Sequence, residues 1–308
     1  MTKYKHILFF NQIGIESLSE VGGKNASLGE MYNQLNPIGI SIPNGFAVTA
    51  EAYRLFRKEN NLEQTLQELL LPLDTKEYSN LSTIGEKARN LILAATMPSE
   101  IREEIKVAYQ SLGEQCEINN VNVAVRSSAT SEDLPTASFA GQMQSFLNIN
   151  CADQLLDAVH RCFVSLFTDR AIKYRNDMGF AEMDIAISVG VQQMVRSDKA
   201  SSGVAFTIDP DSGFENTIII NGCWGLGENI VQGAVTPDEW MVFKPTLENP
   251  DLNPILKKQC GKKEFTMIYA EKTESTSAEN TIVNTKTTLE KQNQFSLTNK
   301  EVIQLSQW

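Results

Sequence analysis

Apolar positions in the first third of the chain recur with the period of a helix. Thr49 stands where it can cap a helix through residues 50–60, and Pro98 suits the first turn of a helix through residues 101–112. After a glycine turn at residues 22–24, three apolar residues follow helical spacing: Leu28, Met31 and Leu35. This third of the chain is therefore predicted to be mostly helical.

From residue 121 the period changes to that of a strand. Three valines alternate with other residues, namely Val121, Val123 and Val125. Residues 144–149 look extended, and residues 152–175 are predicted as one long helix. Four short apolar runs then follow, with Gly and Asp-Pro between them: residues 186–195, 203–209, 217–222 and 240–244. Their close succession predicts a sheet built largely of strands that are neighbours in sequence.

The last part of the chain combines a polar stretch with a helix start. Residues 271–297 are rich in Thr and Asn and are expected to form an exposed hairpin or loop. Thr298 and Glu301 have the spacing of a capping box, and an amphipathic helix follows them. This helix reaches Trp308 after about three turns. Its apolar face favours a truncated chain, and the alternative is a terminal helix docked on the core.

Composition narrows the classes of function. The 308 residues are 42% hydrophobic and 21% charged, which suits one large domain or two lobes. The net charge of -11 argues against nucleic acid and anionic membranes as partners, so an anion site must be local. Five cysteines without a C-x-x-C pair favour a reduced, cytoplasmic setting. No apolar run has the length of a membrane span or of a signal peptide.

Two stretches could hold phosphate, although neither matches a standard nucleotide motif. The turn at residues 22–24 lacks the upstream glycine of a Walker A loop, and residues 225–230 lack the third glycine of a Rossmann fingerprint. Lys24 nevertheless opens a helix, where the positive end of the helix dipole favours anions. Arg126 is predicted to end a strand, and its guanidinium can fork onto phosphate oxygens. The alternatives are an ordinary surface lysine and an arginine tied to a structural carboxylate.

Six segments, read in order, resemble the N-terminal nucleotide-binding domain of the phosphoenolpyruvate synthase (pyruvate, water dikinase) family. They are VGGKNASLGEM (21–31), IPNGFAVTAEAY (42–53), VRSSATSEDLPTASFAGQ (125–142), SLFTDRAIKYR (165–175), GVQQMVRSDKASSGVAFTIDPDSGF (190–214) and GLGENIVQGAVTPDEWMVFKP (225–245). The resemblance implies an α+β, ATP-grasp-type domain over residues 1–308. Its approximate lobes would be residues 1–190 and 191–308, and it would be C-terminally truncated.

The resemblance also carries over individual residues. On the phosphate side, Lys24 and Arg126 match phosphate-contacting residues with a catalytic role, and Gly141 matches the glycine of the loop over the phosphates. Ser145 stands where relatives often have threonine, which keeps the hydroxyl. On the base side, three residues match: Gln192 at the adenine edge, with Met194 and Val195 in the hinge whose backbone would meet the purine. Glu228 lies in a matching motif without an assigned role.

Other parts of the family's machinery are expected outside this sequence. The family passes phosphoryl from ATP to a histidine on a separate domain, whereas His6 lies beside a strand start and His160 is expected to be a packed or partly exposed helix residue. The pyruvate-binding barrel and the Mg²⁺ ligands are also expected beyond Trp308, so no metal ligand is assigned here. The chain is therefore predicted to bind ATP and to be inactive alone. The resemblance is compatible with a homodimeric full-length enzyme.

Two rival functions use the same features. An antibiotic phosphotransferase of the rifampin type would share the ATP-binding domain and differ in its acceptor domain. A stand-alone nucleotide-binding module would bind ATP without passing phosphoryl to any acceptor.

Overall fold

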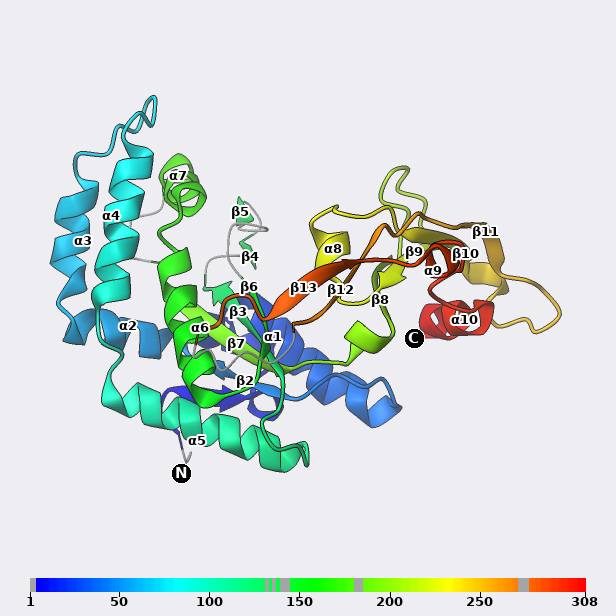
Figure 1. Cartoon of the computed structure of the whole chain (residues 1–308), viewed down its shortest axis with the longest axis horizontal. Coiled ribbons are helices and arrows are strands. Elements are labelled where there is room, and N and C mark those ends of the chain that lie inside the picture. Colours follow the sequence, from blue (N-terminus) through cyan, green and yellow to red (C-terminus); the bar gives the residue numbers. More distant parts are fainter. Residues whose placement is uncertain (1–3, 131–132, 135–136, 139–144, 180–184, 271–276) are drawn as a thin grey trace. The chain divides into compact units, whose positions relative to one another are not determined.

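A computed structural model describes residues 4–130, 133–134, 137–138, 145–179, 185–270 and 277–308 (Figure 1). These residues form two compact units, one drawn from Met1–Met194 and Glu274–Glu279 and the other from Val195–Thr273 and Asn280–Trp308. Helices and antiparallel sheets occur in both units. The predicted α+β class is therefore confirmed.

A five-stranded antiparallel sheet organises the first unit, in the order β1-β2-β7-β3-β6. Its strands are β1 (Ile7–Phe9), β2 (Gly45–Val48), β3 (Val123–Ala129), β6 (Ser145–Ile149) and β7 (Ile187–Gln193). A separate short ladder pairs β4 (Asp133–Leu134) with β5 (Ala137–Ser138). The run at residues 186–195 was expected beside its sequence neighbours. Instead, β7 inserts between β2 and β3, because its alternating Ile and Val side chains complete the core of this unit.

Seven helices of the first unit surround this sheet among the described residues. They are α1 (Leu18–Leu35), α2 (Ala50–Glu59), α3 (Leu62–Leu70), α4 (Leu81–Ala94), α5 (Ser99–Gln115), α6 (Ala152–Ser165) and α7 (Asp169–Asp177). Short 3-10 turns occupy Phe10–Gln12, Ile15–Ser17 and Asn36–Ile38. The sequence therefore indicated the helical character of the first third correctly.

Three details at helix ends differ from the prediction. The single helix expected over residues 152–175 is wrong, because Thr168 caps a new helix by accepting the N–H of Ala171 at 3.3 Å. Thr49 stands at the N-cap of α2, but its buried hydroxyl makes no hydrogen bond with the described residues. Pro98 precedes α5 as its N-cap residue and so lies just outside the first turn.

The two faces of the five-stranded sheet are covered differently. Helices α2, α5 and α6 pack on one face, and α3, α4 and α7 pack against other helices of this group. Together they enclose the largest apolar core, which includes alternate residues of the strands: Ile7, Phe9, Phe46, Val48, Val123, Val125, Val189 and Val191. Helix α1 packs on the other face against β3 and β7. A smaller apolar cluster there contains Phe10, Ile13, Val21, Ala26 and Ala47.

The second unit contains a four-stranded antiparallel sheet whose neighbours follow each other in sequence, as predicted, in the order β11-β10-β9-β8. Its strands are β8 (Ser201–Phe206), β9 (Thr217–Trp224), β10 (Asp238–Phe243) and β11 (Ile255–Gln259). A hairpin pairs β12 (Phe265–Tyr269) with β13 (Ile282–Lys286), and β13 lies within the predicted polar stretch at residues 271–297. Lys263 and Asp238 form a fully buried ion pair in this unit.

Short helices complete the second unit. They are α8 (Glu228–Val231), α9 (Leu289–Gln292) and α10 (Asn299–Gln307), with 3-10 turns at Ser197–Lys199 and Lys244–Thr246. The capping box predicted at Thr298 and Glu301 is confirmed, since Thr298 Oγ1 accepts the N–H of Glu301 and the Glu301 carboxylate accepts the N–H of Thr298. Val302 of α10 is buried against the sheet core. None of the helices in the described part of the chain is long and apolar enough to span a membrane.

Candidate functional site

The face of the five-stranded sheet that packs against α1 becomes polar at strands β7 and β3. Successive side chains of a strand point to opposite faces. Since Val125 and Val191 belong to the large core, the residues beside them point toward α1. These residues are Ala124 and Arg126 on β3, and Gly190 and Gln192 on β7. Two strands that are distant in sequence therefore place an arginine and a glutamine on one face.

Helix α1 approaches this face at a break in its backbone. Gly22 has a φ of 72° and a ψ of 165°, and a Cβ at this position would lie 2.4 Å from the Ser128 hydroxyl. Glycine meets both constraints because it has no Cβ. Helical geometry resumes after Gly22, so Lys24 lies in the first turn of the continued helix with its side chain exposed. The glycine turn predicted to open a helix is present, although a short helical turn also precedes it.

Asn25 fixes this first turn against β7. Its side chain is nearly fully buried and donates hydrogen bonds to the Ser188 hydroxyl at 3.0 Å and to the Val21 carbonyl at 3.1 Å. The glycine at position 190 permits the close approach, because a Cβ there would lie 2.2 Å from Asn25 Oδ1. Asn25 therefore holds the adjacent Lys24 in place over the sheet.

A pocket of about 330 Å³ lies at this junction. It is lined by residues of α1, β3 and β7, namely Lys24, Asn25, Ser27, Leu28, Ala124, Arg126, Ser127, Gly190 and Gln192. Two of these side chains are cationic and none is a carboxylate, although acidic residues outnumber basic ones by 38 to 27 in the chain. The pocket is thus a local positive site on an acidic protein. It unites three residues singled out in the sequence: Lys24, Arg126 and Gln192.

Arg126 lies within β3, so the prediction that it ends the strand is wrong. The strand continues to Ala129 because β7 pairs with it residue by residue over this length. Arg126 is exposed, and no carboxylate among the described residues forms an ion pair with it. Ser145 of β6 stands directly opposite Arg126 in the ladder. Since cross-strand partners share a face, the Ser145 side chain belongs to the same polar face.

The residues predicted to meet a purine lie where β7 ends. Gln192 donates its amide to the Pro43 carbonyl at 3.2 Å. The backbone N–H of Met194 donates to the Asn122 carbonyl at 2.8 Å. The carbonyl of Val195 accepts the N–H of Ser197 at 2.7 Å. Met194 belongs to the first compact unit and Val195 to the second.

Two further residues named in the sequence remain to be described. Gly141, expected in the loop over the phosphates, lies outside the described residues. Glu228 begins α8 in the second unit, where its carboxylate accepts the side-chain amide of Gln232 at 2.9 Å. The structure therefore adds no role for Glu228 beyond this local contact.

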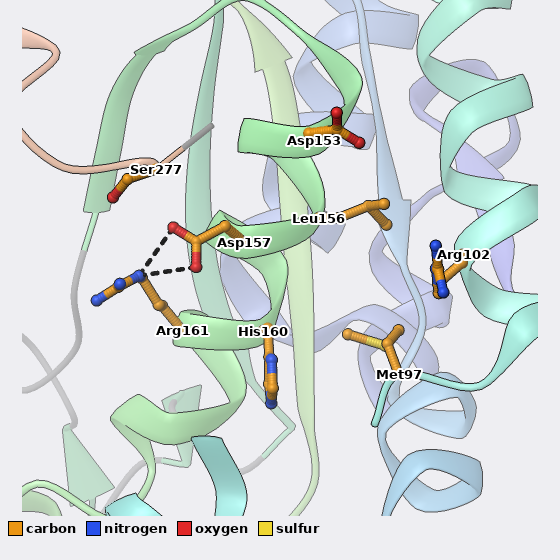
Figure 2. Close-up of a pocket in the computed structure, with 8 residues that line it drawn as sticks. All are labelled: Met97, Arg102, Asp153, Leu156, Asp157, His160, Arg161 and Ser277. Atoms are coloured by element: carbon orange, nitrogen blue, oxygen red, sulfur yellow. Dashed lines mark hydrogen bonds and ion pairs between the residues drawn. The ribbon is translucent and has the colours of Figure 1, made fainter. Parts of the chain in front are cut away.

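The two histidines occupy other places. His160 lies on α6, in the second pocket shown in Figure 2, which has a volume of about 530 Å³. Its Nε2 donates to the Ile92 carbonyl at 2.8 Å, and its ring packs edge-on against Phe56. Burial lowers the pKa of His160, although the Ile92 carbonyl acts in the opposite direction. The expected packed or partly exposed helix histidine is confirmed. His6 is almost fully buried beside β1.

Sequence reasoning missed Asn25 and its partner Ser188. Both are polar residues at positions that the structure buries, and the sequence offers a signal for each. Asn25 directly follows the glycine turn and Lys24, and Ser188 interrupts the apolar run of β7. A buried polar side chain needs a hydrogen-bond partner, but the partner here is distant in the chain and was not evident from spacing.

The family model for the pyruvate phosphate dikinase AMP/ATP-binding domain matches residues 18–308. Phosphoenolpyruvate synthase of Helicobacter pylori is 45% identical over 304 residues, which is 99% of this chain and 37% of that protein. The enzymes of the same name from Aquifex aeolicus and Escherichia coli are 46% and 44% identical over 98% and 97% of this chain. The chain spans 34% and 37% of those two proteins, or roughly a third of their length.

Proposed function

Since this chain belongs to the family of pyruvate phosphate dikinase AMP/ATP-binding domains, we propose that it binds ATP as the nucleotide-binding part of a phosphoenolpyruvate synthase. One observation carries the proposal. Lys24, Arg126 and Gln192, from three separate elements, line a single pocket whose described lining holds two cations and no carboxylate. A polyphosphate is an anion of the size and charge that such a pocket attracts.

The two cations suit different tasks on the phosphates. Arg126 presents a planar guanidinium that can bind two phosphate oxygens at once, and the rigid strand β3 fixes its origin. Lys24 adds a compact charge at the restart of a helix, where backbone N–H groups also face an anion. Ser145 adds a hydroxyl opposite Arg126. Phosphoryl transfer depends mainly on positioning and on charge neutralisation, which these groups supply.

The adenine is proposed to lie where β7 ends. Gln192 would face the edge of the adenine, and the backbone of Met194 and Val195 would contact the purine ring. Since the N–H of Met194 already donates to Asn122, the donor to the purine would be the N–H of Val195. Gly141 is proposed to lie over the phosphates, as the resemblance implies. The ATP-grasp assignment of the two lobes belongs to the same proposal.

The reaction of the whole enzyme is proposed from the relatives. It would convert ATP, pyruvate and water to AMP, phosphoenolpyruvate and phosphate through a phosphohistidine. His160 is engaged with a carbonyl and His6 is buried, which supports an acceptor outside this chain. Mg²⁺ is proposed to accompany the nucleotide. A homodimeric enzyme located in the cytoplasm completes the proposal. Three relatives named phosphoenolpyruvate synthase, at 44–46% identity, favour it over an antibiotic phosphotransferase.

Calorimetric titration of this chain with Mg-ATP tests the proposal, with Lys24→Ala and Arg126→Ala as the variants. Each substitution removes charged hydrogen bonds worth about 1.5–3 kcal/mol, so the Kd should rise by about 10- to 100-fold. The same variants should change the affinity for AMP less, because AMP lacks the β- and γ-phosphates.

Two variants serve as matched controls. Lys58→Ala removes an exposed lysine from α2, and Arg102→Ala removes an exposed arginine that lines the second pocket (Figure 2). Both should bind ATP like the unmodified chain. Loss of binding in Arg102→Ala with retention in Arg126→Ala would move the nucleotide to the second pocket and contradict the proposal.

A further inference from the structure

The N-terminal strand and helix α5 bring one histidine and two glutamates together. His6 directly precedes β1, and Glu100 and Glu104 are four residues apart on α5, so both carboxylates project from one side of the helix. One ligand atom of each residue lies within 4.8 Å of the ligand atoms of the other two. The cluster lies where α5 meets β1 and β2, on the side of the sheet away from the pocket of Lys24.

The imidazole of His6 lacks the partner that a buried ring requires. The side chain is 1% exposed, and neither ring nitrogen forms a hydrogen bond within the described structure. The Nε2 atom lies 3.8 Å from Glu100 Oε1, which is too long for a hydrogen bond. Buried polar groups in proteins nearly always have a partner. The ring therefore points an unsatisfied nitrogen at two carboxylates.

A metal ion between these groups would satisfy all three. Zinc binds imidazole nitrogen and carboxylate oxygen at about 2.0–2.2 Å, so two of its ligands stand at most about 4.4 Å apart. The separation of 3.8 Å between His6 Nε2 and Glu100 Oε1 fits this limit. The Glu100 side chain is 49% exposed and can rotate to bring its oxygen closer.

We propose that His6, Glu100 and Glu104 bind one divalent transition metal ion of the zinc type, with water in the remaining position. An imidazole with two carboxylates suits zinc and its neighbours, whereas Mg²⁺ and Ca²⁺ prefer oxygen ligands alone. The Glu104 carboxylate is held in place by the backbone N–H of His6 at 2.8 Å and that of Lys5 at 3.1 Å. Such supporting hydrogen bonds orient a ligand toward its metal.

The ammonium group of Lys5 is the competing cation. It lies 3.5 Å from Glu100 Oε1, on a side chain that is 68% exposed. A long exposed lysine exchanges readily with water, so a metal ion can displace it from the carboxylate. The bound ion would join the chain before β1 to the first two turns of α5. Its role would be structural, and it does not depend on the proposed nucleotide site.

Titration of the chelator-stripped chain with Zn²⁺ tests this site, with Co²⁺ as a spectroscopic probe. One Zn²⁺ per chain is expected, together with a visible absorption band of low-symmetry Co²⁺. Glu100→Gln should weaken Zn²⁺ binding at least 10-fold, and His6→Ala should abolish it. Glu103→Gln is the matched control: this exposed neighbour pairs with Lys106 at 3.7 Å, is not part of the cluster, and should bind Zn²⁺ like the unmodified chain.

The exposed Glu100 keeps the test independent of folding. His6 is buried, so His6→Ala could alter the fold, whereas Glu100→Gln retains the size of an exposed side chain. Circular dichroism of both variants identifies any loss of structure. Zn²⁺ binding that Glu100→Gln leaves unchanged would place the ion elsewhere, for example on the five free thiols, and would overturn the proposal. Absence of Zn²⁺ binding to the folded chain would overturn it as well.

Discussion

Val125 and Arg126 are adjacent in sequence and lie on opposite faces of the same sheet. Val125 is fully buried in the large core, whereas Arg126 is exposed and lines the polar pocket. The same division holds on β7, where Val191 is buried in the core and Gln192 lines the pocket. One face of the sheet thus supplies stability, and the other presents polar groups that the core does not need.

The polar face is itself divided. Over β2, helix α1 closes the face with apolar contacts that include Ala47. Over β7 and β3, the glycine at position 190 and the break at Gly22 bring α1 close to the sheet while leaving a pocket beside it. The location of the site therefore follows from where the apolar cover of α1 ends. Substitutions on the two faces should separate stability from binding.

The largest expected effect comes from the apolar face. Phe46 on β2 is fully buried and packs against Phe9 with ring centroids 5.6 Å apart. Phe46→Ala should lower the free energy of unfolding by about 3–5 kcal/mol, because it leaves a cavity in the core. Urea denaturation followed by circular dichroism measures this loss. Arg126→Ala should change the same quantity by about 0.5 kcal/mol or less, as exposed substitutions usually do. Equal losses in the two variants would contradict the division between the faces.

A smaller effect is expected where a residue of the polar face also supports the packing of α1. In Gly190→Ala the new methyl group would meet Asn25 Oδ1, displacing an amide that bonds to Ser188. The loss should be about 1–3 kcal/mol of unfolding free energy. If the proposed function holds, Mg-ATP binding should weaken too, because Lys24 loses its support. Denaturation and calorimetry on the same variant measure both quantities.

A double variant identifies the cause of that loss. In the Asn25→Ala background the methyl group of Gly190→Ala meets no amide, so its added cost should fall well below its cost alone. Strictly additive losses would show that Asn25 is not the group displaced, and the account of how α1 is held would need revision.

The alternation of residues that separates the two faces of the sheet could be predicted from the sequence. The pairing partners of each strand could not. The valines at 121, 123 and 125 predicted a strand, and in any strand adjacent residues such as Val125 and Arg126 point to opposite faces. The strands from β8 to β11 were also predictable in outline, since each pairs with its neighbour in sequence. Strand β7 pairs instead with β2 and β3, and no local pattern encodes such a distant pairing.

The site was predictable in its chemistry and less so in its geometry. Lys24 and Arg126 were identified as phosphate candidates from their local context, and the structure places them in one pocket. The end of β3 was misjudged because it depends on a partner that is distant in sequence, β7. A contact also decided a helix boundary that the sequence did not show. The Thr168 hydroxyl accepts the N–H of Ala171 and starts a new helix, where the sequence predicted the interior of one long helix.

The smallest expected effect concerns a titrating group at the edge of the apolar side. His160 lies on α6, and desolvation lowers its pKa below that of an unfolded chain, with the Ile92 carbonyl and Asp157 acting in the opposite direction. The folded state therefore binds fewer protons than the unfolded state as the pH falls below about 6.5. Stability should be greatest above this pH and should decline below it.

His160→Gln isolates this contribution, because glutamine can still donate to the Ile92 carbonyl but does not titrate. Urea denaturation of both chains at pH 7.5 and pH 5.5 gives the change in unfolding free energy for each. The unmodified chain should lose more stability than His160→Gln between these two values, by an amount smaller than either effect above. Equal losses would mean that His160 accepts a proton as easily in the folded chain as in the unfolded one. In that case the pocket around His160 would be polar enough to hydrate the charged ring.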